Sequence, residues 1–304
     1  MKNDNQPLVS VAVITYNSSK TVEETLDSIY NQTYPNLELI ISDDCSTDNT
    51  VKICRDWIEV HKGRFVRTEL LTAEKNTGVS ANMNRGADAC RGEWVKDIAG
   101  DDLLLPDCVQ TYVDYVGEHP EAVYVFAKVE TFGGEEDRRK EIGNQFLYDF
   151  FNWPIKQQYD FLTLERNCIP ASTAFYNRER IIVLGIRNDE RIPLLEDWPK
   201  WINLLKAGVH IDFVDKVTVR YRVGETGLST QLDKPLIWRQ QFALMELYYR
   251  LPYMKEINYS KRKMWRRRQY AKQVLEPKWY RSVALGSYER GAALYRLLTG
   301  KEID

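Results

Sequence analysis

Residues 94–102 read Trp-Val-Lys-Asp-Ile-Ala-Gly-Asp-Asp, a β-prone segment that runs into a glycine and then into two adjacent carboxylates. The carboxylates belong to Asp101 and Asp102, and hard oxygen ligands of this kind bind Mg²⁺ or Mn²⁺ together with the phosphates of a substrate. Taken alone, the pair is better explained as a solvent-exposed turn, because a two-residue motif arises often by chance. The sequence on either side of the pair therefore has to decide between the two interpretations.

The sequence before Asp101 alternates between short apolar runs and segments with helical periodicity. We expect strands over residues 8–15, 37–42, 66–71 and 94–99, with helices between them over about 21–30, 46–60 and 79–90. Thr21 and Glu24 have the spacing of a capping box at the start of the first helix. Strands that alternate with helices predict a doubly wound α/β fold with a mostly parallel sheet.

Polar side chains follow each of the four expected strands. They are Thr15 and Tyr16, Asp43 and Asp44, Asn76, and Asp101 and Asp102. Parallel sheets bind ligands beyond the carboxyl ends of their strands, so these clusters predict one shared nucleotide site. The sequence contains neither GxGxxG nor GxxxxGK[ST], so the charge of a diphosphate would have to be met by a metal ion and basic side chains.

Composition is that of an ordinary globular protein, with 43% apolar and 28% charged residues in 304. This length favours one large domain with an appendage. Residues 1–7 show no apolar leader, and no run of about 18 apolar residues is present. The five cysteines are scattered without a CxxC pair, which favours a reducing cytoplasm and makes a zinc site improbable.

Charge is distributed unevenly along the chain. From residue 255 onward there are 13 Lys and Arg against 5 Asp and Glu, whereas the whole chain has 42 against 44. A basic tail with interleaved aromatics suits an anionic membrane surface, such as the inner leaflet. Packing of this tail on the acidic body is an equal alternative. Nucleic acid is not expected, because no known nucleic-acid-binding module accompanies the basic patch.

Several ordered motifs resemble the family 2 glycosyltransferases of the GT-A fold. They are VSVAVITYN at 9–17, DDCSTDNT at 43–50, NTGVSANMNRGADACRGEW at 76–94 and GDDLLLPD at 100–107. The resemblance is close over about 8–125 and extends more weakly to about 230. It implies a nucleotide-sugar-binding half (8–125) and an acceptor half (126–230) within a 1–230 catalytic domain, followed by a basic helical region (231–304).

The resemblance places the donor nucleotide on the loops that follow the first strands. It implies contacts from Thr15, Tyr16, Asn17, Asp44 and Asn76. The Asp44 carboxylate would accept a hydrogen bond from the N3–H of uracil, and the Tyr16 ring would cover the base. Loop packing is the alternative role of Tyr16.

The resemblance also implies a divalent cation, Mg²⁺ or Mn²⁺, with Asp102 as the more direct ligand and Asp101 nearer the ribose. The chain departs from many relatives by having Ala99 in place of a further aspartate. It also lacks a histidine after Tyr221 and Arg222, which puts a third protein ligand in doubt. Arg222 would then stabilise the diphosphate leaving group directly, or else is a surface arginine of an edge strand.

A second acidic pair, Glu196 and Asp197, precedes the helical pattern that begins with Trp198. The pair could simply complement the positive end of the helix dipole. The resemblance instead implies that it supplies the catalytic base, with Asp197 in that role and Glu196 beside it. Trp198 would stack on an acceptor sugar or pack in the core.

Together these features predict a metal-dependent inverting transferase that uses a nucleotide sugar, most simply a UDP-sugar. Its acceptor would be a glycan or a lipid-linked acceptor in the synthesis of a bacterial surface polysaccharide, met in the cytoplasm or at the inner face of the membrane. Two other functions stay open. One is a nucleotidyltransferase that makes sugar nucleotides, and the other is a non-catalytic assembly protein that binds nucleotide.

Overall fold

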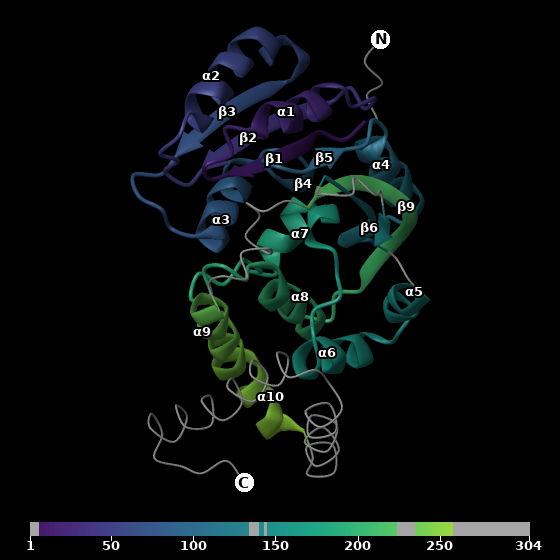
Figure 1. The fold of residues 1–304 in the computed structure, drawn as a ribbon. Helices are drawn as coiled ribbons and strands as arrows, with labels where there is room; N and C mark the ends of the chain where they lie inside the picture. Colours follow the sequence, from purple (N-terminus) through teal and green to yellow (C-terminus); the bar gives the residue numbers. More distant parts are fainter. Residues whose placement is uncertain (1–5, 134–139, 143–144, 224–234, 258–304) are drawn as a thin grey trace. The chain divides into compact units, whose positions relative to one another are not determined.

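The computed structural model describes residues 6–133, 140–142, 145–223 and 235–257 (Figure 1). The chain divides into two compact units. The first contains residues 1–159 and 167–230, and the second contains residues 160–166 and 231–304. All candidate site residues lie in the first unit.

The strands of the first unit are β1 (Val9–Thr15), β2 (Leu37–Asp43), β3 (Arg67–Thr72), β4 (Trp94–Ala99), β5 (Leu103–Leu104), β6 (Tyr124–Phe132), β7 (Lys140–Ile142), β8 (Phe175–Asn177) and β9 (Ile211–Arg222). Its helices are α1 (Val22–Tyr30), α2 (Thr50–His61), α3 (Val79–Ala89), α4 (Cys108–Glu118), α5 (Gln145–Phe151), α7 (Arg178–Val183) and α8 (Asp197–Lys206). Helix α6 (Ile155–Leu164) begins in the first unit and ends in the second. Short 3₁₀ turns occupy Lys62–Arg64 and Ala171–Thr173.

The strands form one sheet in the order β3-β2-β1-β4-β8-β6-β9-β5, with β7 paired to β6. The N-terminal half of this sheet, β3-β2-β1-β4, is entirely parallel. Strand β8 is antiparallel to both β4 and β6, and it joins this half to the parallel pair of β6 and β9. The α/β class and the four predicted strands with their intervening helices are therefore confirmed.

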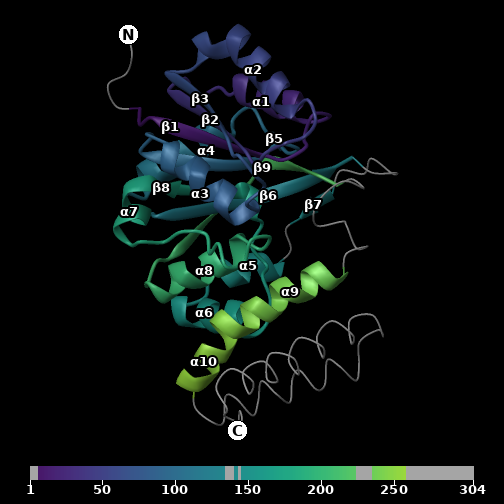
Figure 2. The ribbon, with the colours of Figure 1, turned by 90° about the vertical axis from the view of Figure 1, so that its left-hand side faces the viewer.

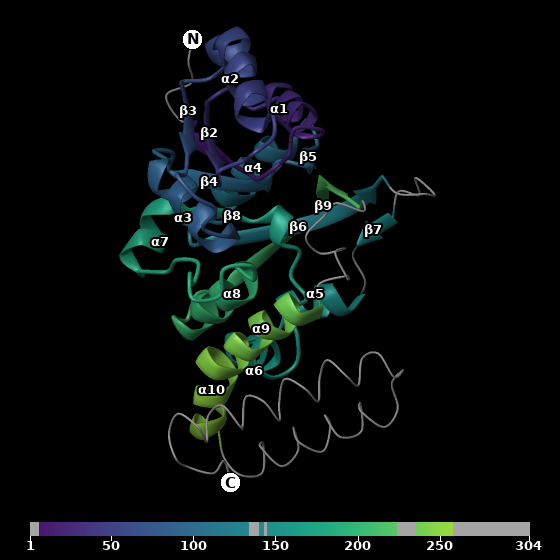
Figure 3. The ribbon, with the colours of Figure 1, turned by 60° about the vertical axis from the view of Figure 1, so that its left-hand side comes forward.

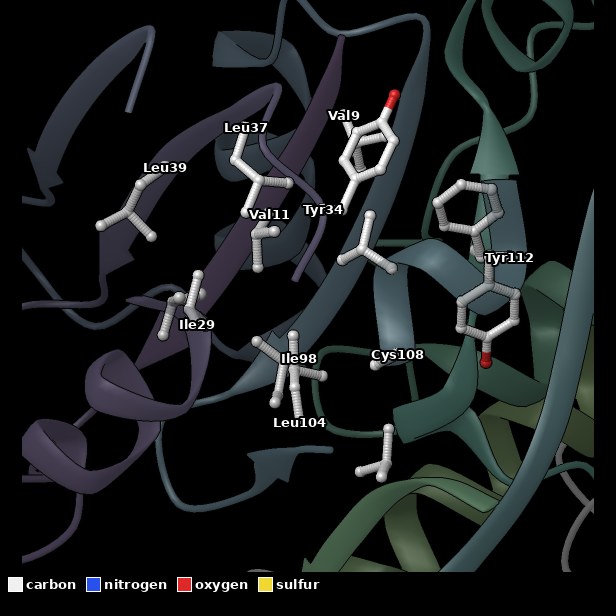
Figure 4. Packing of buried hydrophobic residues seen from close by; sticks show 14 of the residues in the cluster. Val9, Val11, Ile29, Tyr34, Leu37, Leu39, Ile98, Leu104, Cys108 and Tyr112 are labelled. Carbon is white, nitrogen blue, oxygen red and sulfur yellow. The ribbon is translucent and has the colours of Figure 1, made fainter. Parts of the chain in front are cut away.

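Both faces of the parallel half are covered by helices (Figures 2 and 3). Alternate residues of β1, namely Val9, Val11 and Val13, are fully buried in a core that includes side chains of α1, α2 and α4. Figure 4 shows this packing around Val9 and Val11. On the opposite face, α3 approaches closely because Gly86 has no side chain: a Cβ there would lie 3.1 Å from the Ile14 Cδ1 atom.

The capping box predicted for α1 is wrong. Thr21 is the N-cap residue, but its side chain makes no capping hydrogen bond. Its hydroxyl instead donates to the Gly100 carbonyl oxygen at 2.8 Å, and Glu24 pairs with Arg222. The two side chains therefore connect α1 to residues close to Asp101, because tertiary partners compete successfully with a local cap.

Gly92 lies close to the backbone of Ser10 and Leu8, so a substitution at Gly92 tests this contact. A Cβ at this position would lie 2.5 Å from the Ser10 nitrogen and 2.8 Å from the Leu8 carbonyl oxygen. We expect Gly92→Ala to lower the free energy of unfolding by about 2–4 kcal/mol, because backbone cannot yield as a flexible side chain does. Gly117→Ala is the control, since nothing lies within 4 Å of its Cβ and alanine is the better helix former. Urea denaturation that gave both variants the wild-type stability would contradict the close approach.

In the second unit, α9 (Pro235–Met245) continues through a π-helical turn (Glu246–Arg250) into α10 (Leu251–Glu256). Arg250 donates to the Thr163 carbonyl oxygen at 3.0 Å and pairs with Glu246 at 2.7 Å. The basic segment from residue 258 onward, and with it the predicted membrane contact, lies outside the described residues. No helix in the described part of the chain is long and apolar enough to cross a membrane.

Candidate active site

The carboxyl ends of β1 and β2 meet as the parallel topology requires. Thr15 and Asp43 are register partners, and the Thr15 hydroxyl donates to the Asp43 carboxylate at 2.9 Å. The Asp44 amide donates to the Thr15 carbonyl oxygen at 3.0 Å. Beyond β4, the Gly100 amide donates to the Ile14 carbonyl oxygen at 2.9 Å. The ends of the three strands are thus joined by hydrogen bonds directly before Asp101.

Asp44 is 2% exposed, and its carboxylate accepts four hydrogen bonds. The donors are the Thr77 amide (2.9 Å), the Thr77 hydroxyl (2.6 Å), the Gly78 amide (2.8 Å) and the Arg85 guanidinium (3.1 Å). Four donors fill the lone-pair positions of a carboxylate. In this structure Asp44 therefore fixes the loop of Thr77 and Gly78, and its contact with a uracil base stays a prediction.

The loops around Asp44 carry the other predicted nucleotide ligands. Tyr16 is 49% exposed, so a face of its ring is accessible to a base. Asn17 has a φ of 52°, and its side-chain oxygen accepts from the Thr47 amide at 2.8 Å. Asn76 is exposed, and its side-chain oxygen accepts from the Gly78 amide at 3.1 Å. Asn17 and Asn76 thus shape the loops, whereas Tyr16 is presented toward solvent.

Asp101 and Asp102 are joined to the far end of the sheet by Arg222. The Asp102 carboxylate accepts from the Arg222 amide at 2.9 Å, and the Arg222 Nε atom donates to the Asp101 carbonyl oxygen at 2.8 Å. The guanidinium also pairs with Glu24 at 2.5 Å and lies 4.4 Å from the centre of the Phe132 ring. Arg222 is therefore held beside the acidic pair, and its role toward a diphosphate stays a prediction.

The electrostatics of the acidic pair suit a cation. Burial, together with the charge of Asp101, raises the pKa of Asp102 to about 8. Burial also raises the pKa of Asp101, and the Arg222 charge opposes that increase. Two such carboxylates fit a divalent ion that takes its other ligands from substrate phosphates and water. Within the described ranges, no group of three or more His, Cys, Asp or Glu is placed to hold a metal ion.

Glu196 and Asp197 stand at the start of α8, and Asp197 is held by its neighbours. The Asn167 amide donates to its Oδ2 atom at 2.5 Å, and the Trp198 backbone amide donates to its Oδ1 atom at 2.6 Å. Desolvation raises the pKa of Asp197 to about 6, and these two hydrogen bonds oppose the increase. Desolvation and the charge of Asp197 raise the pKa of Glu196 to about 8. The two carboxyl groups therefore titrate as a pair, and they hold a proton to higher pH than isolated carboxyl groups do.

The loop before Glu196 is attached to the nucleotide side of the site. The Ser80 amide donates to the Pro193 carbonyl oxygen at 3.1 Å, and the Ser80 hydroxyl donates to the Ile192 carbonyl oxygen at 2.7 Å. Gly78 has a φ of 87°, and a Cβ there would lie 2.9 Å from the Pro193 carbonyl oxygen. The loop that Asp44 fixes is therefore in direct contact with the segment that leads into Glu196.

Trp198 is 6% exposed, which leaves little of its ring accessible to a sugar. This burial agrees with the packing alternative, and a role in acceptor binding stays a prediction. Sequence reasoning missed Asn167 as the partner of Asp197. It also missed a buried group of charges on β4 and α8, formed by Lys96, Asp97 and Lys200. The available signal was the pair Lys96-Asp97 inside an otherwise β-prone run.

Comparisons with known proteins show the family of this chain. The family model described as Glycosyl transferase family 2 matches residues 10–183. A protein of Bacillus subtilis (strain 168) named as a teichuronic acid biosynthesis glycosyltransferase, TuaG, is 26% identical over 225 residues, which are 74% of this chain and 82% of that protein. The Escherichia coli UDP-Glc:alpha-D-GlcNAc-diphosphoundecaprenol beta-1,3-glucosyltransferase WfaP is 25% identical over 76% of this chain and 83% of its own length.

Among solved structures, S. aureus TarS in complex with UDP-GlcNAc is similar to this chain with a TM-score of 0.64 at 17% identity. The similarity covers 94% of this chain and 80% of that one. This likeness confirms the predicted GT-A type of α/β fold.

Proposed function

Because this chain belongs to glycosyl transferase family 2, we propose that it moves a sugar from a UDP-sugar to an acceptor hydroxyl with inversion at the anomeric carbon. One observation carries the proposal. The loop of Thr77 and Gly78, held by Asp44, contacts the segment that leads into Glu196 and Asp197. A donor bound at the strand ends would therefore lie close to a carboxylate able to act as a base. The TarS structure with UDP-GlcNAc supports a UDP-sugar as donor.

In this mechanism Asp197 acts as the general base. Its carboxylate is ionised near pH 7 and is oriented by Asn167 and by the Trp198 amide. It takes the proton from the acceptor hydroxyl while that oxygen forms a bond to the sugar C1 atom. The bond from C1 to the diphosphate oxygen breaks in the same step, and the nucleoside diphosphate leaves. A single in-line displacement of this kind inverts the configuration at C1.

Asp102 and Asp101 would hold Mg²⁺ or Mn²⁺ together with the donor phosphates. A bound divalent ion supplies positive charge that stabilises the departing diphosphate. Arg222 places a permanent cation beside the same two carboxylates, fixed by its hydrogen bond to the Asp101 carbonyl oxygen. The chain thereby provides charge stabilisation on the donor side and proton removal on the acceptor side.

The acceptor we propose is a growing glycan or a lipid-linked sugar of a bacterial surface polysaccharide. The support comes from the names of two relatives, one in teichuronic acid biosynthesis and one acting on a GlcNAc-diphosphoundecaprenol. A lipid-linked acceptor would place the protein at the inner face of the membrane, where the basic region would meet anionic lipid.

Calorimetric titration with UDP and GDP, each with and without Mn²⁺, tests the donor site. We expect UDP to bind at least about tenfold more tightly with Mn²⁺ than without it, because the ion shields the diphosphate from Asp101 and Asp102. We expect GDP to bind at least about tenfold more weakly than UDP, since the purine would not fit a uracil pocket. Preference for GDP would reassign the donor to a GDP-sugar. If neither nucleotide bound, the transferase proposal would give way to a non-catalytic role.

A further inference from the structure

Lys200 is a buried cation on α8, 3% exposed, one turn after Glu196 and Asp197. Its Nζ atom lies 4.0 Å from the Oδ2 atom of Asp97, which is on β4 and 5% exposed. At this separation the two groups attract each other by charge, beyond the length of a direct hydrogen bond. The pair connects the helix that begins at Asp197 to the strand that precedes Asp101.

Aromatic rings enclose the pair. The Lys200 ammonium lies 4.7 Å from the centre of the Tyr176 ring and 5.6 Å from that of Tyr124. The Tyr176 hydroxyl donates to the Asp97 Oδ1 atom at 3.4 Å. Trp201, the next residue of α8, packs edge-on against Tyr124 with ring centres 5.2 Å apart. Rings at these positions attract the cation and exclude water, so the charges act on their neighbours with little screening.

Stability does not account for a charged pair at this place. Removing two charges from water is costly, and apolar residues of similar size often give an equally stable protein. The pair therefore has its main consequence for the groups around it. The positive charge of Lys200 lowers the pKa of Glu196, whereas the negative charges of Asp97 and Asp197 raise it.

Charged and titratable groups face this pair from several elements. They are Lys96 and Asp97 of β4, Tyr124 of β6, Tyr176 of β8, Arg187 of the loop after α7, and Glu196 and Asp197 of α8. The other buried lysine, Lys96, is already satisfied, because it donates to the carbonyl oxygens of Asp97 and Ser172. Burial lowers the pKa of Lys200, and the charges of Asp97 and Glu196 oppose this decrease. Lys200 is thus the lysine of this group that interacts with Glu196.

We propose that Lys200, held by Asp97, is a positioning residue that fixes the start of α8 against β4 and so places Asp197 for proton removal. The proposal rests on the function proposed above, in which Asp197 is the base. Without the Lys200 charge, the negative charge of Asp97 would act on Glu196 uncompensated, and the acidic pair would hold its protons to higher pH. The same change would release the contact between α8 and β4.

The test compares three variants by UDP release from a panel of UDP-sugars over about pH 5–9. They are Lys200→Met, the double variant Asp97→Asn with Lys200→Met, and Lys206→Met as an exposed control on the same helix. We expect Lys200→Met to lower kcat at pH 7 at least about tenfold, and to move the acid limb of the pH profile upward by about one unit. The affinity for UDP should stay within about twofold of the wild type, because the change is on the acceptor side.

The double variant separates positioning from folding. It removes both charges, so it should recover much of the thermal stability that Lys200→Met loses, and the acid limb should return toward that of the wild type because Lys200 and Asp97 shift the pKa of Glu196 in opposite directions. The kcat should stay lowered, because the contact between α8 and β4 is still missing. Wild-type kcat with a wild-type acid limb in either variant would overturn the proposal. If the wild-type protein released no UDP from any UDP-sugar, the function proposed above would fail instead. If Asp197→Asn were inactive while Lys200→Met behaved as wild type, only the role of Lys200 would be lost.

Discussion

Asp197→Asn is expected to lower kcat for sugar transfer by about 10³-fold, within the range of loss when a general base is removed. An amide cannot take the proton of the acceptor hydroxyl. Its oxygen can still accept a hydrogen bond from the Trp198 amide, so the start of α8 should keep its conformation. The affinity for UDP should stay within about twofold of the wild type, since Asp197 is assigned to the acceptor side. Steady-state kinetics and calorimetry on the same preparation measure both quantities.

Glu196→Gln is the matched control for that prediction. Burial and the charge of Asp197 raise the pKa of the Glu196 carboxyl group to about 8, which favours its protonated form near pH 7. Replacing it by a neutral amide therefore changes little charge, and we expect a loss of less than about tenfold. A large loss with Glu196→Gln and a small one with Asp197→Asn would exchange the roles of the two residues. If both variants kept the activity of the wild type, neither Glu196 nor Asp197 would have a role in the mechanism.

The parallel half of the fold could be predicted because its signals are local. Strands such as β1 and β2 are buried on both faces, so each is a mostly apolar run in the sequence, interrupted by Ser10 in β1 and by Glu38 in β2. Once parallel order is inferred, the meeting of Thr15 with Asp43 follows from topology alone. The prediction that these strand ends meet at one edge of the sheet is therefore confirmed without knowledge of any long-range contact.

Contacts between distant segments could not be predicted in this way. Arg222 meets Asp102 across 120 residues, and the sequence left open whether it was a surface side chain. The charges of Lys96 and Asp97 inside a β-prone run are a local signal, but nothing in the sequence identifies Lys200 as the partner of Asp97. Thr21 is the reverse case. The sequence shows a local capping pattern, but in the structure the Thr21 hydroxyl donates to the Gly100 carbonyl oxygen. The hydrogen-bond partner of a buried polar group depends on tertiary packing, which sequence periodicity does not predict.

Asp44 is another residue whose hydrogen-bond partners could not be predicted from the sequence. A carboxylate after a strand of a nucleotide-binding sheet predicts a contact with the base, and the resemblance implied this role. The structure shows all four acceptor positions engaged by Thr77, Gly78 and Arg85. A base that bound to Asp44 would have to replace one of these donors, and Arg85 makes the longest of the four hydrogen bonds.

Asp102→Asn is expected to remove the response to metal and to lower kcat by about 10²–10³-fold, the effect of losing several kcal/mol of charge stabilisation. The amide oxygen can still accept from the Arg222 backbone amide, so the contact between β9 and the acidic pair should persist. UDP should then bind with nearly equal affinity with and without Mn²⁺. Addition of a chelator should inactivate the wild-type protein and leave the residual activity of the variant unchanged.

Glu24→Gln is the control for Asp102→Asn. Glu24 is a nearby carboxylate that pairs with the Arg222 guanidinium, but its side chain is 61% exposed and lies outside the acidic pair. Its removal frees the guanidinium without changing the candidate metal ligands, so kcat should change less than about threefold, as for other exposed ion pairs. A wild-type protein that kept its kcat in the presence of a chelator would show that Arg222 and other side chains stabilise the leaving diphosphate without a metal. In that case Asp102 would serve to hold β9 in place through the Arg222 amide.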